Sequence, residues 1–251
     1  MKVLVIFGSV SDSSVYEPIT AGLENAGISY EMRVLSAHRT PKEIDRLQFD
    51  SYDAVIAGAG LAAHLPGVVA ARFSGPVFGV PCSVAFEGLD SFLSIVQMPP
   101  GIPVLCTPVE KGNEAVNALV QMPKAKEMQL CYSKKSKAVE KAVEIFDQFG
   151  AKIGQDIEPS PGKINILFLE KGSKLKTEGI TIICPICDSS KAPDALEWFA
   201  ESDRGLWVGL NRGENAALAA LQLARSFNNE LKKYKEEMRL KVLEADRKQN
   251  G

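Results

Sequence analysis

Residues 3–12 read VLVIFGSVSD and decide the fold of the chain. Five consecutive apolar residues, Val3–Phe7, predict a strand that is buried on both faces. Gly8–Ser14 is small and polar, which indicates a loop after that strand. Tyr16, Ile19, Leu23 and Ala26 then recur at helical spacing, and Gly27 predicts the end of the helix. The stretch therefore opens a strand–loop–helix alternation.

The alternation continues to about residue 121. Further strands are predicted up to residue 35 and at 53–57, 76–80 and 102–106, with helices at 89–98 and 114–121. Thr40-Pro41-Lys42-Glu43 predicts a capped helix start, and Gly58-Ala59-Gly60 predicts a tight turn into a helix. This order predicts an α/β protein with a doubly wound parallel sheet, a flavodoxin- or Rossmann-like three-layer sandwich.

The second half of the chain repeats the first more weakly. Shifted by 104 residues, Pro81, Asp90, Gly101 and Val104 align with Pro185, Asp194, Gly205 and Val208 without a gap. Such matches in one window predict a tandem duplication, with modules at 1–122 and 123–251 and a linker at 123–126. The second module lacks a counterpart of residues 36–41. After Ala216 we expect one long, solvated or oligomer-packing helix to about Arg247.

Composition excludes several classes of protein. The chain of 251 residues is 45% hydrophobic and 24% charged, as in an ordinary globular protein. A net charge of −2 argues against a nucleic-acid-binding protein, which would need a positive electrostatic field. No apolar run is long enough to span a membrane. The start reads as a strand rather than a signal peptide. Five scattered cysteines favour reduced thiols in the cytoplasm.

The two histidines, His38 and His64, are the main candidates for proton chemistry. A single histidine is more often structural. Both, however, follow predicted strands at the carboxyl edge of the sheet, where ligands bind in open parallel sheets. We therefore favour a functional role for the pair.

Neighbouring residues are candidates for binding. Ser9, Ser11 and Asp12 precede a helix start and could bind an anion or sugar hydroxyls, or could merely cap the helix. Ser36 and Arg39 flank His38. The planar guanidinium of Arg39 could donate two hydrogen bonds to a phosphate, or it could form a surface ion pair.

Two short motifs need separate interpretation. Gly58-Ala59-Gly60 is weak evidence for a dinucleotide-binding site. We instead expect the backbone of Ala59 and Gly60 to contact a small planar ligand closely. Cys184-Pro185-Ile186-Cys187 has no second cysteine pair to complete a metal site, and we expect neither a metal nor a redox role there.

Three motifs in order resemble the PurE family, the class I 5-(carboxyamino)imidazole ribonucleotide mutases of purine synthesis. They are GSxSD at 8–12, SAHRTP at 36–41 and AGAGxAAHLPG at 57–67. The resemblance continues through 76–81, 88–91, 94–99 and 101–104 and covers residues 1 to about 122. Arg39 and the AAHLPG string resemble the mutase class rather than the class that carboxylates aminoimidazole ribonucleotide directly.

The resemblance implies roles for these residues. Ser9, Ser36 and Arg39 would hold the ribose phosphate, Ser11 and Asp12 the ribose, and Ala59 and Gly60 the imidazole. His38 would be the general acid and base, and His64 would help to hold the migrating carboxylate or carbon dioxide. The resemblance implies an imidazole ribonucleotide as substrate, and no cofactor.

Two departures from the family pattern stand out. Leu61 replaces a usual glycine, and the second module has neither histidine nor a glycine turn. Family members are octamers, so we expect a homo-oligomer, a tetramer in which two modules per chain rebuild an octamer-like particle. The alternatives are direct carboxylation of aminoimidazole ribonucleotide, or a non-catalytic nucleotide-binding module.

Overall fold

A computed structural model describes residues 1–187 and 191–250. The expected second module, residues 123–251, includes residues 188–190 and 251, which lie outside the described ranges. Residues 188–190 also belong to the stretch that aligns with the first half at a shift of 104. The described strands form one sheet: β1 (Lys2–Phe7), β2 (Ser29–Val34), β3 (Ala54–Ala59), β4 (Val77–Pro81), β5 (Leu105–Cys106), β6 (Met128–Cys131), β7 (Gly154–Asp156), β8 (Ile164–Glu170), β9 (Ile180–Ile186) and β10 (Leu206–Trp207).

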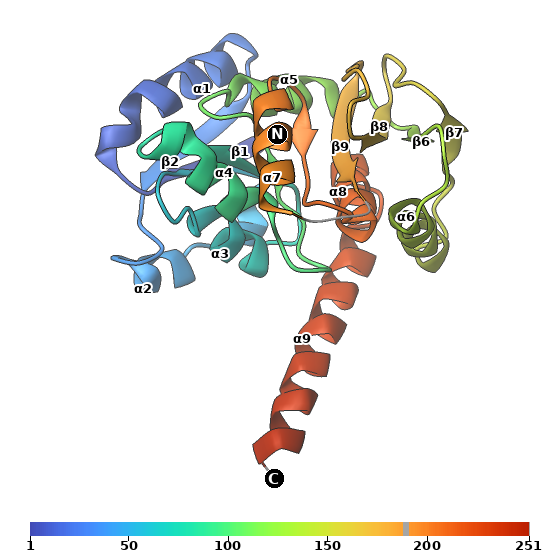
Figure 1. The fold of residues 1–251 in the computed structure, drawn as a ribbon. Helices are drawn as coiled ribbons and strands as arrows, with labels where there is room; N and C mark the ends of the chain where they lie inside the picture. The colour runs from blue at the N-terminus through green and yellow to red at the C-terminus, as the bar shows by residue number, and fades with distance from the viewer. Residues whose placement is uncertain (188–190, 251) are drawn as a thin grey trace.

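Helices cover both faces of this sheet (Figure 1). One face carries α1 (Ser13–Asn25), α5 (Asn113–Gln121), α6 (Lys137–Gln148) and α8 (Gly213–Ala224). The other carries α2 (Pro41–Asp45), α3 (Leu65–Arg72), α4 (Leu89–Val96) and α7 (Ala192–Glu201). The strands supply alternate residues to two cores: Val3, Val5 and Phe7 to one, Leu4 and Ile6 to the other. The three-layer α/β fold expected from the sequence is confirmed.

The strand order repeats between the halves. It runs β2-β1-β3-β4-β5-β10-β9-β8-β6-β7, so the second half has the order of the first, read from the opposite edge. All described strand pairs are parallel except β5–β10, where Trp207 lies opposite Cys106. The sheet is therefore not purely parallel: one antiparallel seam joins two parallel halves.

Details of the two loops that precede α5 and α8 also repeat. Glu110 and Asn211 have φ angles of 59° and 57°, and their amides donate to the carbonyls of Pro81 (2.8 Å) and Pro185 (2.9 Å). Their side chains accept from the amides of Ser83 (3.3 Å) and Cys187 (3.1 Å). These paired features support the proposal that one module was duplicated.

The C-terminal region differs from the expected single helix. It forms α8 and α9 (Asn228–Asn250), which are separated at Arg225, a residue with a φ of 60°. Residues 213–223 of α8 are all buried, so α8 belongs to the core and only α9 projects from the body of the molecule (Figure 1). The expected strand 102–106 is also shorter, because only Leu105 and Cys106 pair with neighbours.

The C-terminal helices tie the second half to the first. The Asn215 side chain, 1% exposed, accepts from the Gly101 amide (2.8 Å) and donates to the Pro99 carbonyl (2.9 Å). Lys235 of α9 donates to the carbonyls of Ala70 (2.5 Å) and Phe73 (2.6 Å) at the end of α3. These contacts join the two halves beyond the seam in the sheet.

Candidate functional site

The candidate residues lie at one edge of the sheet. Strands β2, β1 and β3 are adjacent and parallel, so the loops at their carboxyl ends meet there. The Gly8 amide after β1 donates to the Gly58 carbonyl of β3 (3.1 Å), which places the first and third loops in contact. The structure thus brings together all three segments that the sequence singled out.

The first loop forms a compact group of hydroxyls beside a carboxylate. Ser9 caps the short 3-10 helix η1 (Val10–Asp12), and its Oγ accepts from the Ser11 amide (3.2 Å) and hydroxyl (2.8 Å). The Ser11 hydroxyl is also 3.4 Å from Oδ1 of Asp12, which is buried. Burial raises the pKa of Asp12 above its ordinary value, against the opposing hydrogen bond from Ser11 and the charge of Arg39.

Arg39 links the second loop to the first. Its guanidinium donates to the Gly8 carbonyl (2.9 Å), and its amide donates to Ser36 Oγ (3.3 Å). The expected capping box at Thr40 is absent, because Thr40 Oγ1 instead accepts from the Ser36 amide (2.8 Å). Thr40 therefore closes the loop that carries His38. Sequence reasoning missed this role because threonine before proline is also typical of a helix start.

The third loop does not begin as a tight glycine turn. Gly58 and Ala59 are the last residues of β3, and the left-handed residue is Leu61, with a φ of 54°. A Cβ atom on Gly60 would lie only 2.4 Å from Cγ2 of Val84, so this position admits no side chain unless Val84 shifts. Gly60 is half-buried, and the Val84 side chain occupies the space beside its backbone where a Cβ atom would stand.

The two histidines are in direct contact. His38 Nε2 lies 2.9 Å from His64 Nδ1, with ring centroids 5.0 Å apart and an angle of 72° between the ring planes. One ring nitrogen donates and the other accepts, so the pair can share and pass on a proton. Both rings are exposed to solvent, and a ligand can therefore reach them directly.

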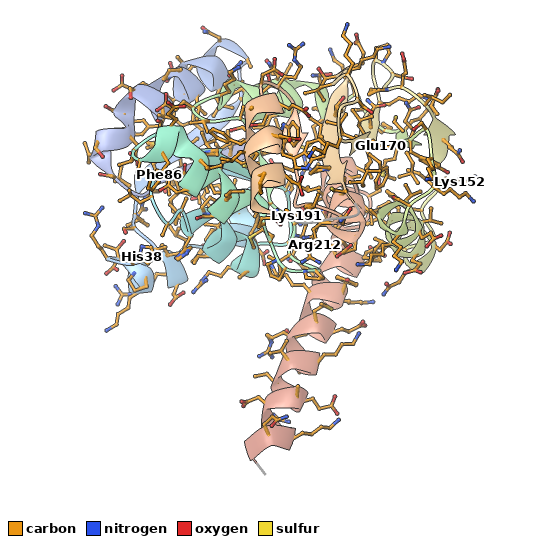
Figure 2. All side chains as sticks on the ribbon, viewed as in Figure 1. His38, Phe86, Lys152, Glu170, Lys191 and Arg212 are labelled. Atoms are coloured by element: carbon orange, nitrogen blue, oxygen red, sulfur yellow. The ribbon has the colours of Figure 1, made fainter. Side chains whose placement is uncertain are left out.

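An apolar rim of four exposed side chains lies on the loops that follow β1, β3 and β4: Val10 (68% exposed), Leu61 (53%), Val84 (59%) and Phe86 (79%). In Figure 2, Phe86 and His38 lie on the same half of the molecule, whereas Glu170 and Lys152 lie on the other. Phe86 also has a left-handed φ, 47°. This rim was not predictable, because apolar residues in loops carry no periodic signal.

The described residues contain no group of three or more histidine, cysteine, aspartate or glutamate side chains that could hold a metal ion. Cys184 is buried in β9, and burial raises the pKa of its thiol well above the ordinary value. None of the described helices combines the length and the apolar character that crossing a membrane requires.

Known proteins resemble this chain over its first half. The AIR carboxylase family model matches residues 2–144. Curated N5-carboxyaminoimidazole ribonucleotide mutases of Methanocaldococcus jannaschii and Pyrococcus abyssi are each 47% identical to it, over 119 and 136 residues. These alignments cover 47% and 50% of this chain, and 76% and 78% of the relatives. A solved PurE structure from Treponema denticola is 28% identical, covers 48% of this chain and 77% of its own, and has a TM-score of 0.41.

Proposed function

Because the chain belongs to the AIR carboxylase family, we propose that it is an N5-carboxyaminoimidazole ribonucleotide mutase. The reaction moves a carboxylate from the exocyclic nitrogen of the imidazole to ring carbon 4. The observation that carries the proposal is the contact of His38 with His64 at 2.9 Å, beside the hydroxyl and guanidinium groups of the neighbouring loops. A proton-transferring pair next to an anion-binding loop is what this chemistry needs.

The polar groups of the first two loops fit a ribose phosphate. Arg39, Ser36 and Ser9 offer one guanidinium and two hydroxyls for the phosphate, and Ser11 and Asp12 lie next to them for the ribose. The Ala59 and Gly60 backbone would lie against the imidazole.

His38 would move the proton in both halves of the reaction. As the bond between nitrogen and the carboxylate carbon breaks, carbon dioxide leaves and His38 protonates the nitrogen. Carbon 4 then attacks carbon dioxide, and His38 removes the proton from carbon 4, so that the histidine is restored. His64 would help to hold the carboxylate or the carbon dioxide beside its target. Positioned proton transfer contributes about 10²–10⁴-fold to such rates, and proximity of carbon dioxide adds to it.

Mutase turnover by the purified protein tests this proposal. We expect the His38→Asn variant to lose about 10²-fold or more of kcat, with the fold intact by circular dichroism. Lys42→Gln is the matched control, because Lys42 is exposed on the adjacent α2 and has no role in the proposal. Normal turnover by His38→Asn would refute the acid–base role. Faster conversion of aminoimidazole ribonucleotide with bicarbonate than of the carbamate substrate would favour direct carboxylation.

We also propose that the chain assembles as a homotetramer, in which two modules per chain give an octamer-like particle. The apolar rim (Val10, Leu61, Val84 and Phe86) supports this, since a neighbouring subunit could cover apolar side chains that are exposed on the loops of one sheet edge. The projecting α9 carries further exposed apolar residues, Leu240, Val242 and Leu243. Light scattering should give the mass of four chains, and a monomer or an eight-chain particle would exclude this arrangement.

The proposed location is the cytoplasm. Four cysteines, Cys82, Cys106, Cys131 and Cys184, are buried and form no disulfide, as is typical of a protein kept under reducing conditions.

A further inference from the structure

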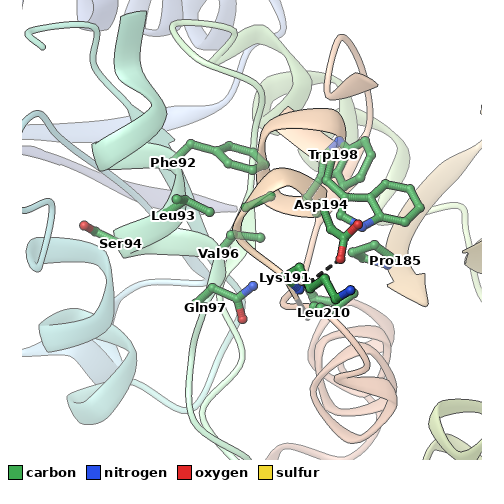
Figure 3. A pocket seen from close by; sticks show the side chains of 13 residues that line it. Phe92, Leu93, Ser94, Val96, Gln97, Pro185, Lys191, Asp194, Trp198 and Leu210 are labelled. Carbon is green, nitrogen blue, oxygen red and sulfur yellow. Dashed lines mark hydrogen bonds between the residues drawn. The ribbon is translucent and has the colours of Figure 1, made fainter. Parts of the chain in front are cut away.

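The two histidines of the chain both lie in its first half, so any part that the second half plays in the proposed proton transfer is indirect. Where the halves meet, α4 and α7 border a cavity of about 520 Å³ (Figure 3). The rings of Phe92, Trp198 and Trp207 beside it are 2%, 6% and 1% exposed and pack on one another. They hold the halves together and do not present a surface to a ligand.

Each histidine stands near the start of a short helix. His64 is the residue that precedes α3, and its carbonyl accepts from the Val68 amide (2.9 Å), which is the first hydrogen bond of that helix. His38 lies in the loop that leads into α2. The distance of 2.9 Å between the two histidines therefore depends on where α2 and α3 begin.

The other ends of these two helices are joined as well. Arg72, the last residue of α3, donates through Nε to Oδ1 of Asp45, the last residue of α2 (2.8 Å). Figure 1 shows α2 and α3 on the same side of the molecule. Because a helix of two turns moves as one rigid element, a displacement at the carboxyl end of α3 is carried to His64 at its start.

Lys235 of α9 holds the carboxyl end of α3. Its Nζ donates to the carbonyls of Ala70 (2.5 Å) and Phe73 (2.6 Å), and a cation at this end also interacts favourably with the helix dipole. The side chain is half-buried, and burial lowers its pKa to about 8, so the ammonium keeps its charge at pH 7. An eight-residue helix depends on such contacts to keep its last turn.

Other residues of the second half hold the same region. A Cβ atom on Gly101 would lie 2.9 Å from Cε of Met238, so α9 packs closely on the Gly101 turn. The Gly101 amide donates to Asn215 of α8 (2.8 Å). The Met98 side chain, just before this turn, lies against Gly67 of α3, where a Cβ atom would be 3.3 Å from it. Helices α8 and α9 thus both support α3.

From these contacts we propose that Lys235 is a positioning residue for His64: it holds the carboxyl end of α3 and so keeps His64 in contact with His38. This role rests on the proposed mutase function, in which the two histidines act side by side. Through Lys235, the second half contributes to the reaction although it holds neither histidine.

Nuclear magnetic resonance of the ligand-free, untagged protein tests the link without any assay of activity. With ¹⁵N-labelled histidine the spectrum contains two side chains, and His38→Asn removes one of them and thereby assigns both. We expect Lys235→Met to move the ring nitrogen signals of His64 by more than their linewidth. Lys235→Arg keeps a charged donor and should return them most of the way to their wild-type positions. Lys233→Met is the matched control, because Lys233 is exposed on the same helix, and should leave them unchanged.

Steady-state kinetics at pH 7 give a second readout. A displacement of about 1 Å at a reacting group can cost about 10²-fold in rate, so we expect Lys235→Met to lower kcat by about 3–30-fold. KM should change little, because the groups proposed to hold the ribose phosphate lie on other loops. Lys235→Arg should recover most of kcat, and Lys233→Met should equal the wild type.

Unchanged His64 signals in a Lys235→Met variant that is folded by circular dichroism would overturn the proposal. A fall in thermal stability without any change at His64 would show that Lys235 is only structural. Lys235→Gln takes the place of Lys235→Met if the methionine variant does not fold. Absence of mutase turnover in the wild-type protein would refute the proposed function instead, and the resonance comparison would still decide whether Lys235 positions His64.

Discussion

At the scale of single residues, the gathering of the candidate residues was predictable because parallel strands end at one edge. Ser9, His38 and His64 each follow a strand of the sheet, and the apolar runs that mark those strands are plain in the sequence. The left-handed conformation of Leu61 was not predictable, since local sequence assigns such backbone to glycine and not to leucine. Leucine at position 61 therefore places conformational strain in the third loop.

Leu61→Gly should therefore stabilise the protein. A left-handed backbone costs a residue with a side chain about 1–2 kcal/mol, and the greater freedom of glycine in the unfolded chain offsets part of this. We expect a net gain of about 0.5–1 kcal/mol in the free energy of unfolding, measured by denaturant titration. Leu240→Gly is the control, because Leu240 is similarly exposed but lies in α9, and it should give no gain.

Asp12→Asn should also stabilise the protein, but at the expense of substrate binding. Burial raises the pKa of Asp12 above 3.8, so the ionised carboxylate is unfavourable in the folded state. The wild-type protein therefore loses stability as the pH rises from about 4 through that raised pKa, and the asparagine variant does not. Urea unfolding at pH 3.5 and pH 7 should show the gain only at pH 7.

Asp147→Asn serves as the control for that measurement, since Asp147 is exposed on α6. If Asp12→Asn and wild type keep the same stability difference at both pH values, the buried-carboxylate interpretation is wrong. KM for the ribonucleotide should rise in Asp12→Asn and stay unchanged in the control.

At the scale of elements, most helices and strands were predictable from periodicity, and the C-terminal break was not. Residues 214–247 contain no glycine or proline, so the usual helix-breaking residues do not mark the end of α8. The chain breaks at Arg225 because α8 is buried against the sheet and α6, while α9 turns to contact α3. Tertiary packing thus ends a helix that local propensity would continue.

Lys235, which fixes α9 to α3, should give the protein a distinct pH dependence. Burial lowers the pKa of Lys235 from 10.5 to about 8. Between these values the unfolded chain holds a proton that the folded chain lacks, so stability rises with pH across this window. The rise should be at most about 3 kcal/mol. It should be absent in Lys235→Met and present in Lys233→Met, whose lysine is exposed on the same helix. Parallel curves for wild type and Lys235→Met would contradict this assignment.

At the scale of the whole molecule, the α/β class and the weak internal repeat were readable from the sequence, whereas the seam was not. Matches such as Gly101 with Gly205 showed where the halves correspond, and both glycines have left-handed φ angles, 88° and 76°. The antiparallel pairing of β5 with β10 was not predictable, because two residues of strand leave no pattern. Only the folded chain shows which edges of the two halves meet.

Residues 1–122 alone should not fold as a stable module. Without the second half, the edge of β5 loses its partner Trp207, and the Gly101 turn loses the Asn215 side chain. Phe92 would lose its contacts with Phe199 and Trp207. We expect the fragment to show no cooperative thermal unfolding, or to aggregate through its open strand edge. A fragment with a sharp transition near that of the full chain would show that the first half is self-sufficient.

The seam between β5 and β10 also decides how the molecule responds to dilution. Two separate chains joined along such an edge would part at low concentration by mass action. Here residues 107–205 connect the two strands covalently, so the pairing of β5 with β10 is intramolecular and does not depend on protein concentration. The half that bears the histidines therefore keeps its neighbour even in nanomolar solution.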